Sequence, residues 1–218
     1  MLIAGFGAFT PLIDEPGLQQ TFAVAFLFGA LALTYDLLLG FTGLLSFGHA
    51  LFYAAGAYGA AYAMARWDWG IIPAGIFALF FAFLVALFTG TAALRVKGIA
   101  FAMVTLAFAE AGHVIVTLNL WGLSEGDKTL QLNFDSVPDF FLGVANTRNL
   151  YLLALITLAI IYLAVWWLTQ SSVGRVWQAL RENEERVSVL GLRPFSFKLI
   201  AFVLAGVMAA FVGVVAVV

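Results

Sequence analysis

Residues 150–168 read LYLLALITLAIIYLAVWWL, a run of nineteen positions without a charged side chain. A helix needs about 20 apolar residues to cross the hydrocarbon core of a bilayer. The chain has six predominantly apolar runs of 19 to 25 residues, 21–39, 42–65, 70–94, 98–120, 150–168 and 199–218, and only Asp36 and Glu110 are charged within them. A closed barrel also satisfies the backbone in lipid, but its strands alternate polar and apolar residues and these runs do not. The sequence therefore predicts an all-α, polytopic membrane bundle of six full spans, with a short apolar segment at 1–13.

The composition of the whole chain agrees with a membrane protein. Hydrophobic residues make up 64% of the 218 positions and charged residues 10%, whereas soluble proteins average about 45–50% and about 25%. The absence of cysteine excludes a disulfide-stapled secreted domain, and the net charge of -2 offers no basic surface for nucleic acid. The solvent of this chain is expected to be lipid.

Basic residues in the connections predict the orientation, because Lys and Arg favour the cytoplasmic side. Seven lie on one side: Arg95, Lys97, Arg175, Arg181, Arg186, Arg193 and Lys198. Three lie on the other: Arg66, Lys128 and Arg148. The acidic residues Asp14, Glu15, Asp68, Glu125, Asp127, Asp135 and Asp139 all fall with the smaller basic group. Residues 95–97 and 169–198 are therefore expected in the cytoplasm.

Both ends of the chain look incomplete. Residues 1–13 are too short to span and lack the basic n-region of a signal peptide. The last span stops at Val218 without a flanking charge or aromatic anchor. We expect a part of a longer membrane protein; the alternative is a six-span protein that ends flush with the bilayer.

Two acidic residues fall inside the predicted spans. Glu110 lies at mid-span with His113 on the same helix face, and a carboxylate there costs about 2.5–3.5 kcal/mol, so it should face protein or a water-filled path. A di-iron site would need a second Glu-x-x-His and two further Glu, so a metal is not expected. A proton relay and a polar helix–helix contact both stay open. Asp36 lies near the end of its span, where a helix-end cap or an interhelical partner is expected.

Residues 40–49, GFTGLLSFGH, interrupt the apolar sequence with three glycines and several polar side chains. Glycine permits unwound backbone, and broken helices at membrane depth usually line a cavity. A tight hairpin between two spans would also need glycine, so both interpretations stay open. A phosphate-binding loop is excluded, because the chain contains neither GxGxxG nor a Gly-Lys pair.

Small residues recur at every fourth position in two stripes, Ala55–Gly59–Ala63 and Ala205–Ala209–Gly213. Such stripes let helix backbones approach closely in membrane bundles. They predict packing rather than chemistry.

Residues 173–190 predict one amphipathic helix outside the membrane. Its apolar side consists of Val173, Val176, Trp177, Leu180, Val187 and Leu190. On its polar side, Arg181 with Glu185 and Glu182 with Arg186 have i,i+4 spacing. Gly191 and Pro194 then form a stop signal. This helix can rest on the headgroups or offer its charged face to a partner.

Three segments resemble branched-chain amino acid ABC-transporter permeases, and more specifically the LivM-type subunit. They are GFTGLLSFGHALFYAAGAY at 40–58, RVKGIAFAMVTLAFAE at 95–110 and SSVGRVWQALRENEERVSVLGLRPFSFKLIAFVLAG at 171–206. The resemblance implies one permease domain over 1–218, incomplete at both ends, in a bacterial-type inner membrane. The sequence departs from the family pattern at Asp36, where Asn is expected, and residues 122–127 match that pattern only loosely.

The resemblance also implies roles for particular residues. Residues 171–194 would be the coupling segment that docks on an ATPase, with Arg181, Glu182, Asn183, Glu184, Glu185 and Gly191 at its core. The translocation region would include Asp36, Gly40, Gly43, Ser46, Gly48, His49, Glu110 and His113. The implied partners are a sister permease subunit, two cytoplasmic ATPase subunits, an external solute-binding protein and membrane lipid. ATP and Mg²⁺ belong to the ATPases, and no cofactor or catalysis is expected in this chain.

Three alternatives to a branched-chain amino acid importer stay open. The same architecture could carry urea, short amides or aromatic acids. A proton-coupled carrier built on Glu110 and His113 would act without ATP, and a structural membrane subunit would not require the glycine-rich interruption.

Overall fold

The computed structural model describes residues 16–118 and 147–217, and this part of the chain is helical. Its elements are α2 (Pro16–Asp36), the π-helical η2 (Leu37–Thr42), α3 (Ala50–Trp67), α4 (Ile71–Ala93), α5 (Ile99–Thr117), α6 (Thr147–Gln170), α7 (Ser172–Glu182), α8 (Glu184–Val189) and α9 (Pro194–Val215). The predicted segment 1–13, the acidic stretch around 122–139 and Val218 lie outside the described residues.

Five helical stretches among the described residues are long and apolar enough to cross a membrane. They are Gly17–Thr42, which joins α2 to η2, together with α4, α5, α6 and α9. These stretches correspond to five of the six predicted spans, and the ends of α4 fall within one residue of its predicted range. The chain is a multi-pass helical membrane protein.

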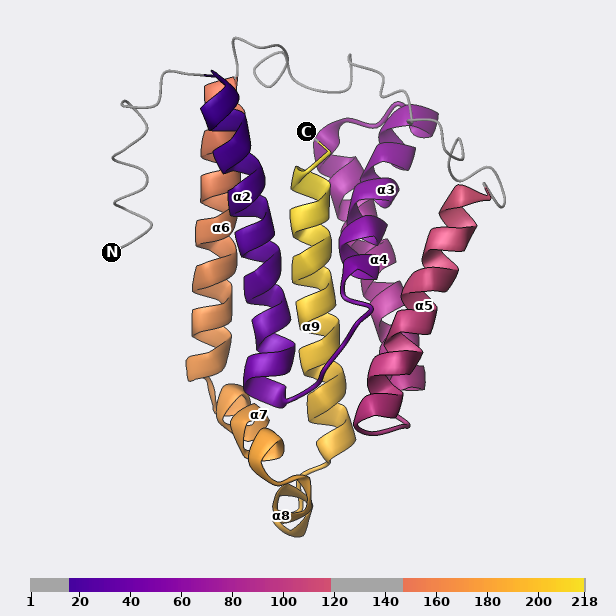
Figure 1. Cartoon of the computed structure of the whole chain (residues 1–218), viewed down its shortest axis with the longest axis vertical. Helices are drawn as coiled ribbons and strands as arrows, with labels where there is room; N and C mark the ends of the chain where they lie inside the picture. The colour runs from indigo at the N-terminus through magenta and orange to yellow at the C-terminus, as the bar shows by residue number, and fades with distance from the viewer. Residues whose placement is uncertain (1–15, 119–146, 218) are drawn as a thin grey trace.

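The predicted span 42–65 is not one continuous helix. The structure begins α3 only at Ala50, and its 18 residues include Arg66, three tyrosines and two glycines, so α3 is less apolar than the five candidate spans. The residues before it run as an extended trace from the end of α2 up to α3 (Figure 1). The second pass across the bundle therefore consists of an unwound segment followed by a shorter helix.

The connections fall at the two ends of the bundle as the charge pattern predicts. Figure 1 shows the α4–α5 turn at the same end as α7 and α8, and the α3–α4 turn at the opposite end. Lys97 in the α4–α5 turn forms an ion pair with Glu184 in α8, with Nζ and Oε2 3.2 Å apart. This contact confirms that residues 95–97 and 169–198 lie on one side of the bundle.

Helix α9 lies in the middle of the bundle, with α3 and α4 on one flank and α2 on the other (Figure 1). The predicted small-residue stripes form close helix contacts: Ala55 packs with Ala82 and Ala210, Gly59 faces Ala78 of α4, and Gly213 of α9 lies so close to α3 that a Cβ would overlap the Tyr53 carbonyl. Small side chains let these backbones come close, and dispersion contacts then hold helices that lipid would solvate equally well. The prediction that the stripes are packing surfaces is confirmed.

The outer faces carry large apolar side chains. Ile76 and Phe80 on α4 are 65% and 60% exposed, and Leu163 on α6 is 58% exposed. Such a surface would be unstable in water but suits hydrocarbon. Trp67 and Trp69 make edge contacts with Phe77 at the α3–α4 turn, where aromatic residues are typical of a membrane boundary.

The predicted helix 173–190 is two helices, because Asn183 breaks it. Asn183 has extended backbone angles (φ -158°, ψ 105°), and its Oδ1 accepts a hydrogen bond from the backbone N–H of Arg186, which caps α8. This break disrupts the i,i+4 spacing, so neither predicted pair, Arg181–Glu185 or Glu182–Arg186, is an ion pair in the described structure. The apolar face is confirmed through Val187, but Leu190 is 78% exposed.

Candidate functional site

The interruption at residues 40–49 is an unwound segment rather than a tight hairpin. After the π-helical turn η2, Gly43 adopts a left-handed conformation (φ 71°), which favours glycine over residues with a Cβ. The backbone N–H of Leu44 donates to the Leu38 carbonyl at 3.0 Å, and the chain then runs without regular structure until the turn that opens α3. Of the two interpretations left open above, the broken pass is the one observed.

The unwound segment, residues 43–48, has a buried side and an open side. Leu44 and Ser46 are 9% and 2% exposed, whereas Leu45 and Phe47, which alternate with them, are 37% and 53% exposed. This alternation is that of an extended chain lying on a packed surface. Leu45 and Phe47 therefore form the more open side of the segment among the described residues.

Helix α5 holds the far end of the unwound segment. The Phe47 N–H donates to Thr105 Oγ1 at 3.1 Å. Gly48 lies so close to α5 that a Cβ at this position would overlap the backbone carbonyl of Thr105. Gly48 is therefore required by close approach, and the segment cannot leave α5 without losing this contact.

His49 ties the start of α3 to α2. Its Nε2 lies 2.8 Å from Thr34 Oγ1, and its ring makes edge contacts with Tyr35 and Phe52. Its Nδ1 and the nearby Ser46 Oγ are buried without a hydrogen-bond partner among the described residues. Two unsatisfied polar atoms beside an unwound backbone are unusual in a packed protein, where such groups are normally paired.

The three polar residues predicted inside the spans lie on exposed surface of this chain. Glu110 and His113 point away from the bundle on α5, which makes few contacts with other helices. The polar helix–helix contact is therefore not formed within the described residues. Asp36 is also exposed, and it makes no side-chain cap; its carboxylate lies over Gly40, where a Cβ would overlap it.

Helix α7 contacts both the unwound segment and α9. Trp177 is fully buried, and its Nε1 donates to the Phe197 carbonyl at 2.9 Å in the first turn of α9. Arg181 Nη1 donates to the Gly40 carbonyl, and its Cγ lies beside Gly43. The structure thus brings a residue predicted for the coupling segment together with residues predicted for the translocation region.

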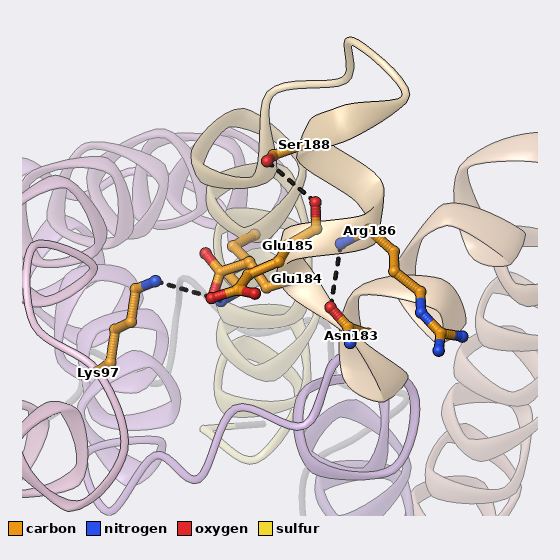
Figure 2. Close-up of polar contacts among 7 residues, drawn as sticks. Lys97, Asn183, Glu184, Glu185, Arg186 and Ser188 are labelled. Carbon is orange, nitrogen blue, oxygen red and sulfur yellow. Dashed lines mark hydrogen bonds and ion pairs between the residues drawn. The ribbon is translucent and has the colours of Figure 1, made fainter.

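Glu184 at the start of α8 bridges two lysines from other elements, and Figure 2 draws its ion pair with Lys97. Its Oε2 lies 2.9 Å from Lys198 Nζ in α9 and 3.2 Å from Lys97 Nζ in the α4–α5 turn. Burial raises the pKa of the Glu184 carboxyl, but the hydrogen bonds and charges of Lys198 and Lys97 outweigh burial, so its pKa is lowered overall. Glu184 is therefore charged wherever the protein is folded near neutral pH.

The sequence did not single out the partners of these residues. Thr34, Thr105, Lys97 and Lys198 complete the contacts of His49, Phe47 and Glu184. Of these four, the sequence marked only Lys97 and Lys198, because both are basic residues in connections predicted to be cytoplasmic. The threonines lie in ordinary apolar helices.

Comparison with known proteins agrees with this arrangement. The model of the family described as "Branched-chain amino acid transport system / permease component" matches residues 17–218. The chain belongs to this family. The resemblance seen in three segments therefore extends over nearly all of the permease.

Two curated relatives carry the same description, "High-affinity branched-chain amino acid transport system permease protein LivM". One is from Salmonella typhimurium and the other from Escherichia coli, and each is 29% identical over 93% of this chain. The match covers 53% of either relative, so the permease spans about half their length. No solved structure matches the chain.

Proposed function

We propose that this chain is the membrane-embedded permease subunit of an ATP-driven importer for branched-chain or similar amino acids. The observation that carries the proposal is the interrupted second pass, residues 37–49, in a chain that belongs to the branched-chain amino acid permease family. The substrate class comes from the names of the relatives. The subunit itself performs no chemistry in this proposal.

Residues 43–48 line the translocation pathway. Each backbone polar group left unpaired in hydrocarbon costs several kcal/mol, so non-helical backbone at membrane depth is tolerated only inside protein or beside a water-filled cavity. The open side of the unwound segment, with Leu45 and Phe47, therefore faces an aqueous path or a second subunit. A second feature is a mostly apolar crevice between α2, α3 and the end of α9, with Leu31 and Tyr53 among its lining residues. Such a lining suits the aliphatic side chain of a branched-chain amino acid.

Residues 171–194 form the coupling segment on the cytoplasmic side. The sequence contains no phosphate-binding motif, so ATP with Mg²⁺ is bound by separate ATPase subunits that dock on α7 and α8. Closure of the ATPases pushes on this segment, and the contacts of Arg181 and Trp177 carry the movement to the unwound segment and to α9. An external solute-binding protein delivers the amino acid to the opposite end.

The sister permease subunit covers α5. Glu110 and His113 are exposed on this helix, and a carboxylate in lipid is too costly to be left uncovered. A second permease subunit beside α5 would shield both residues and close the pathway. Glu110 and His113 then belong to the translocation region through this interface rather than through a proton relay.

Cysteine accessibility tests the pathway, because the chain has no native cysteine. In membranes that contain the assembled transporter, Leu45→Cys and Phe47→Cys are expected to react with a membrane-impermeant thiol reagent, and the adduct is expected to block uptake. Ile160→Cys on α6 is the matched control, because it is 47% exposed in the chain yet faces lipid, and it should react only after denaturation.

Two results would overturn parts of the proposal. If both segment cysteines stay unlabelled with and without ATP, residues 43–48 do not line the path. If the assembled transporter takes up labelled urea or an aromatic acid but not leucine, isoleucine or valine, the architecture stands and the substrate class is wrong.

A further inference from the structure

Six residues form the core of the coupling segment by resemblance, but they do not all face the same way. Glu184 and Arg181 turn toward the bundle, where they contact other elements. Arg181 is exposed but is held by its hydrogen bond to Gly40. Glu182, Glu185 and the neighbouring Arg186, in contrast, are exposed and make no ion pair among the described residues. In Figure 2 the Arg186 side chain extends away from the Glu184 contacts. The segment thus has an inward and an outward face.

The Glu184–Lys198 pair is the stronger of the two ion pairs on the inward face. The Lys198 side chain is 15% exposed and that of Glu184 is 28% exposed, whereas Lys97 is 78% exposed. Exposed pairs contribute about 0–1 kcal/mol because water and salt screen them, while removal of one partner of a shielded pair leaves an uncompensated charge. Movement of α8 is therefore transmitted mainly to α9 and only weakly to the α4–α5 turn.

Arg181 provides the second inward contact. Its guanidinium binds the carbonyl of Gly40 in the π-helical turn, and its stem packs on Gly43, where the chain leaves the helix. A π-helical turn leaves backbone carbonyls poorly placed for regular helical bonds, so an arginine can hold one from outside. Movement of α7 is transmitted to the start of the unwound segment.

Resting on the proposed function, we infer that Arg181 and Glu184 are transmission residues and that Glu182, Glu185 and Arg186 make the contact with the ATPase. Alternating access has to move the central helix α9 and the segment 43–48. Glu184 contacts the first through Lys198, and Arg181 contacts the start of the second at Gly40 and Gly43. Their loss would leave the ATPases docked but disconnected from the pathway. Loss of the outward charges would weaken docking itself.

The test uses the whole transporter, made of this chain with its sister permease and cognate ATPases. Arg181→Gln and Glu184→Gln are compared with Glu185→Gln and Arg186→Gln, which remove the same types of charge from the outward face. Arg95→Gln is the neutral control, because Arg95 is an exposed arginine in the α4–α5 turn, outside the coupling segment. Two quantities are measured for each variant: the amount of ATPase that copurifies with the tagged chain, and the leucine transported per ATP hydrolysed.

The inward variants are expected to retain the ATPase at the wild-type level and to transport at least about fivefold less leucine per ATP, the lower end of typical coupling free energies. The outward variants should show the reverse, with less copurified ATPase and normal transport per ATP in the complexes that remain. The triple variant Glu184→Lys, Lys97→Glu, Lys198→Glu restores both ion pairs with reversed charges and should recover coupling.

Three results would overturn the inference. The first is loss of copurified ATPase in Arg181→Gln and Glu184→Gln, which would make them docking residues while the proposed function stands. The second is a lower melting temperature in the inward variants together with equal losses of ATPase and transport, which would make their role structural. The third is a wild-type ratio of leucine transported per ATP in both Arg181→Gln and Glu184→Gln. If no variant in 171–194 changed either quantity, the coupling segment itself, and with it the proposed function, would fail.

Discussion

Arg181 Nη1 donates a hydrogen bond to the Gly40 carbonyl across 141 residues of sequence. This contact joins the helix that resembles an ATPase coupling segment to the turn at which the second pass unwinds. The apolar side chains of Leu38 and Leu180 belong to one core beneath this contact, so Arg181 adds a direct polar connection to a packed one.

Gly43→Ala should lower both stability and transport. Gly43 has φ 71°, and a residue with a Cβ in this conformation costs about 1–2 kcal/mol. The new methyl group would also press on the Arg181 stem, 3.1 Å from the ideal Cβ position. Thermal unfolding in detergent measures the loss. Gly17→Ala, in open space on α2, is the control and should leave the melting temperature unchanged or slightly raised.

Thr105→Val removes the hydroxyl that holds the unwound segment on α5 while it keeps the shape of the side chain. The partly buried Phe47 N–H then loses its hydrogen-bond partner, at a cost of up to about 1–3 kcal/mol for an unsatisfied donor. Thr91→Val deletes only an exposed hydroxyl that bonds within its own helix, so it should change stability far less. Equal melting temperatures for the two variants would show that α5 does not anchor the segment.

Thr34→Val tests the contact between α2 and His49. The buried ring already has one unsatisfied nitrogen, and this change removes the partner of the other. We expect a destabilisation of about 1–3 kcal/mol from the stranded imidazole. The double variant Thr34→Val, His49→Phe removes both polar groups and should recover part of the loss, measured by the same melts. If the double variant is no more stable than Thr34→Val, the hydrogen bond is not the source of the effect.

Glu184 gives the protein a defined acid sensitivity. Its pKa in the folded protein lies below the ordinary 4.5, so its ion pairs contribute stability that is fully present above the unfolded pKa and is lost as the pH falls through the folded pKa. The difference in melting temperature between wild type and Glu184→Gln should therefore be constant near neutral pH and shrink below 4.5. A difference that grows on acidification would contradict this sign.

Lys198→Met should be more harmful than Lys97→Met. Both variants remove one partner of Glu184, but Lys198 is shielded and Lys97 is in solvent. A shielded charge that loses its partner is destabilised far more than an exposed one. Melting temperatures and transport per ATP, measured on the two variants side by side, give the comparison. The reverse order would mean that the α4–α5 turn, rather than α9, is the main recipient of the movement.

Composition and run length predicted most of the fold. Helix α4 agrees with its predicted range because Gly70 and Arg95 bound a strongly apolar run. The predicted span 42–65 was wrong as one continuous helix, because hydropathy does not record a left-handed Gly43 or the approach of Gly48 to Thr105, although the glycines of 40–49 had left a broken helix open. The split of α7 from α8 was missed because Asn183 occupies a polar position in either conformation, and its cap on Arg186 becomes visible only in three dimensions.

The candidate site was predicted in its parts but not in its connections. The resemblance pointed to residues 40–49 and 171–194, and the charge count placed Lys97 with Lys198 on one side. Nothing in the sequence pairs Arg181 with Gly40 or Glu184 with Lys198, because such contacts depend on how α7 and α8 fold back under the bundle. Glu110 and His113 shared a helix face as predicted, but that face proved to be outside the packed bundle of this chain.

The most direct test of the central claim is leucine accumulation in proteoliposomes that contain this chain with its sister permease, its ATPases and the solute-binding protein. We predict accumulation against a gradient that requires hydrolysable ATP, is absent when this chain is reconstituted alone, and persists in Glu110→Gln. Uptake by this chain alone that ignores ATP and disappears in Glu110→Gln would contradict the account and show a proton-coupled carrier instead.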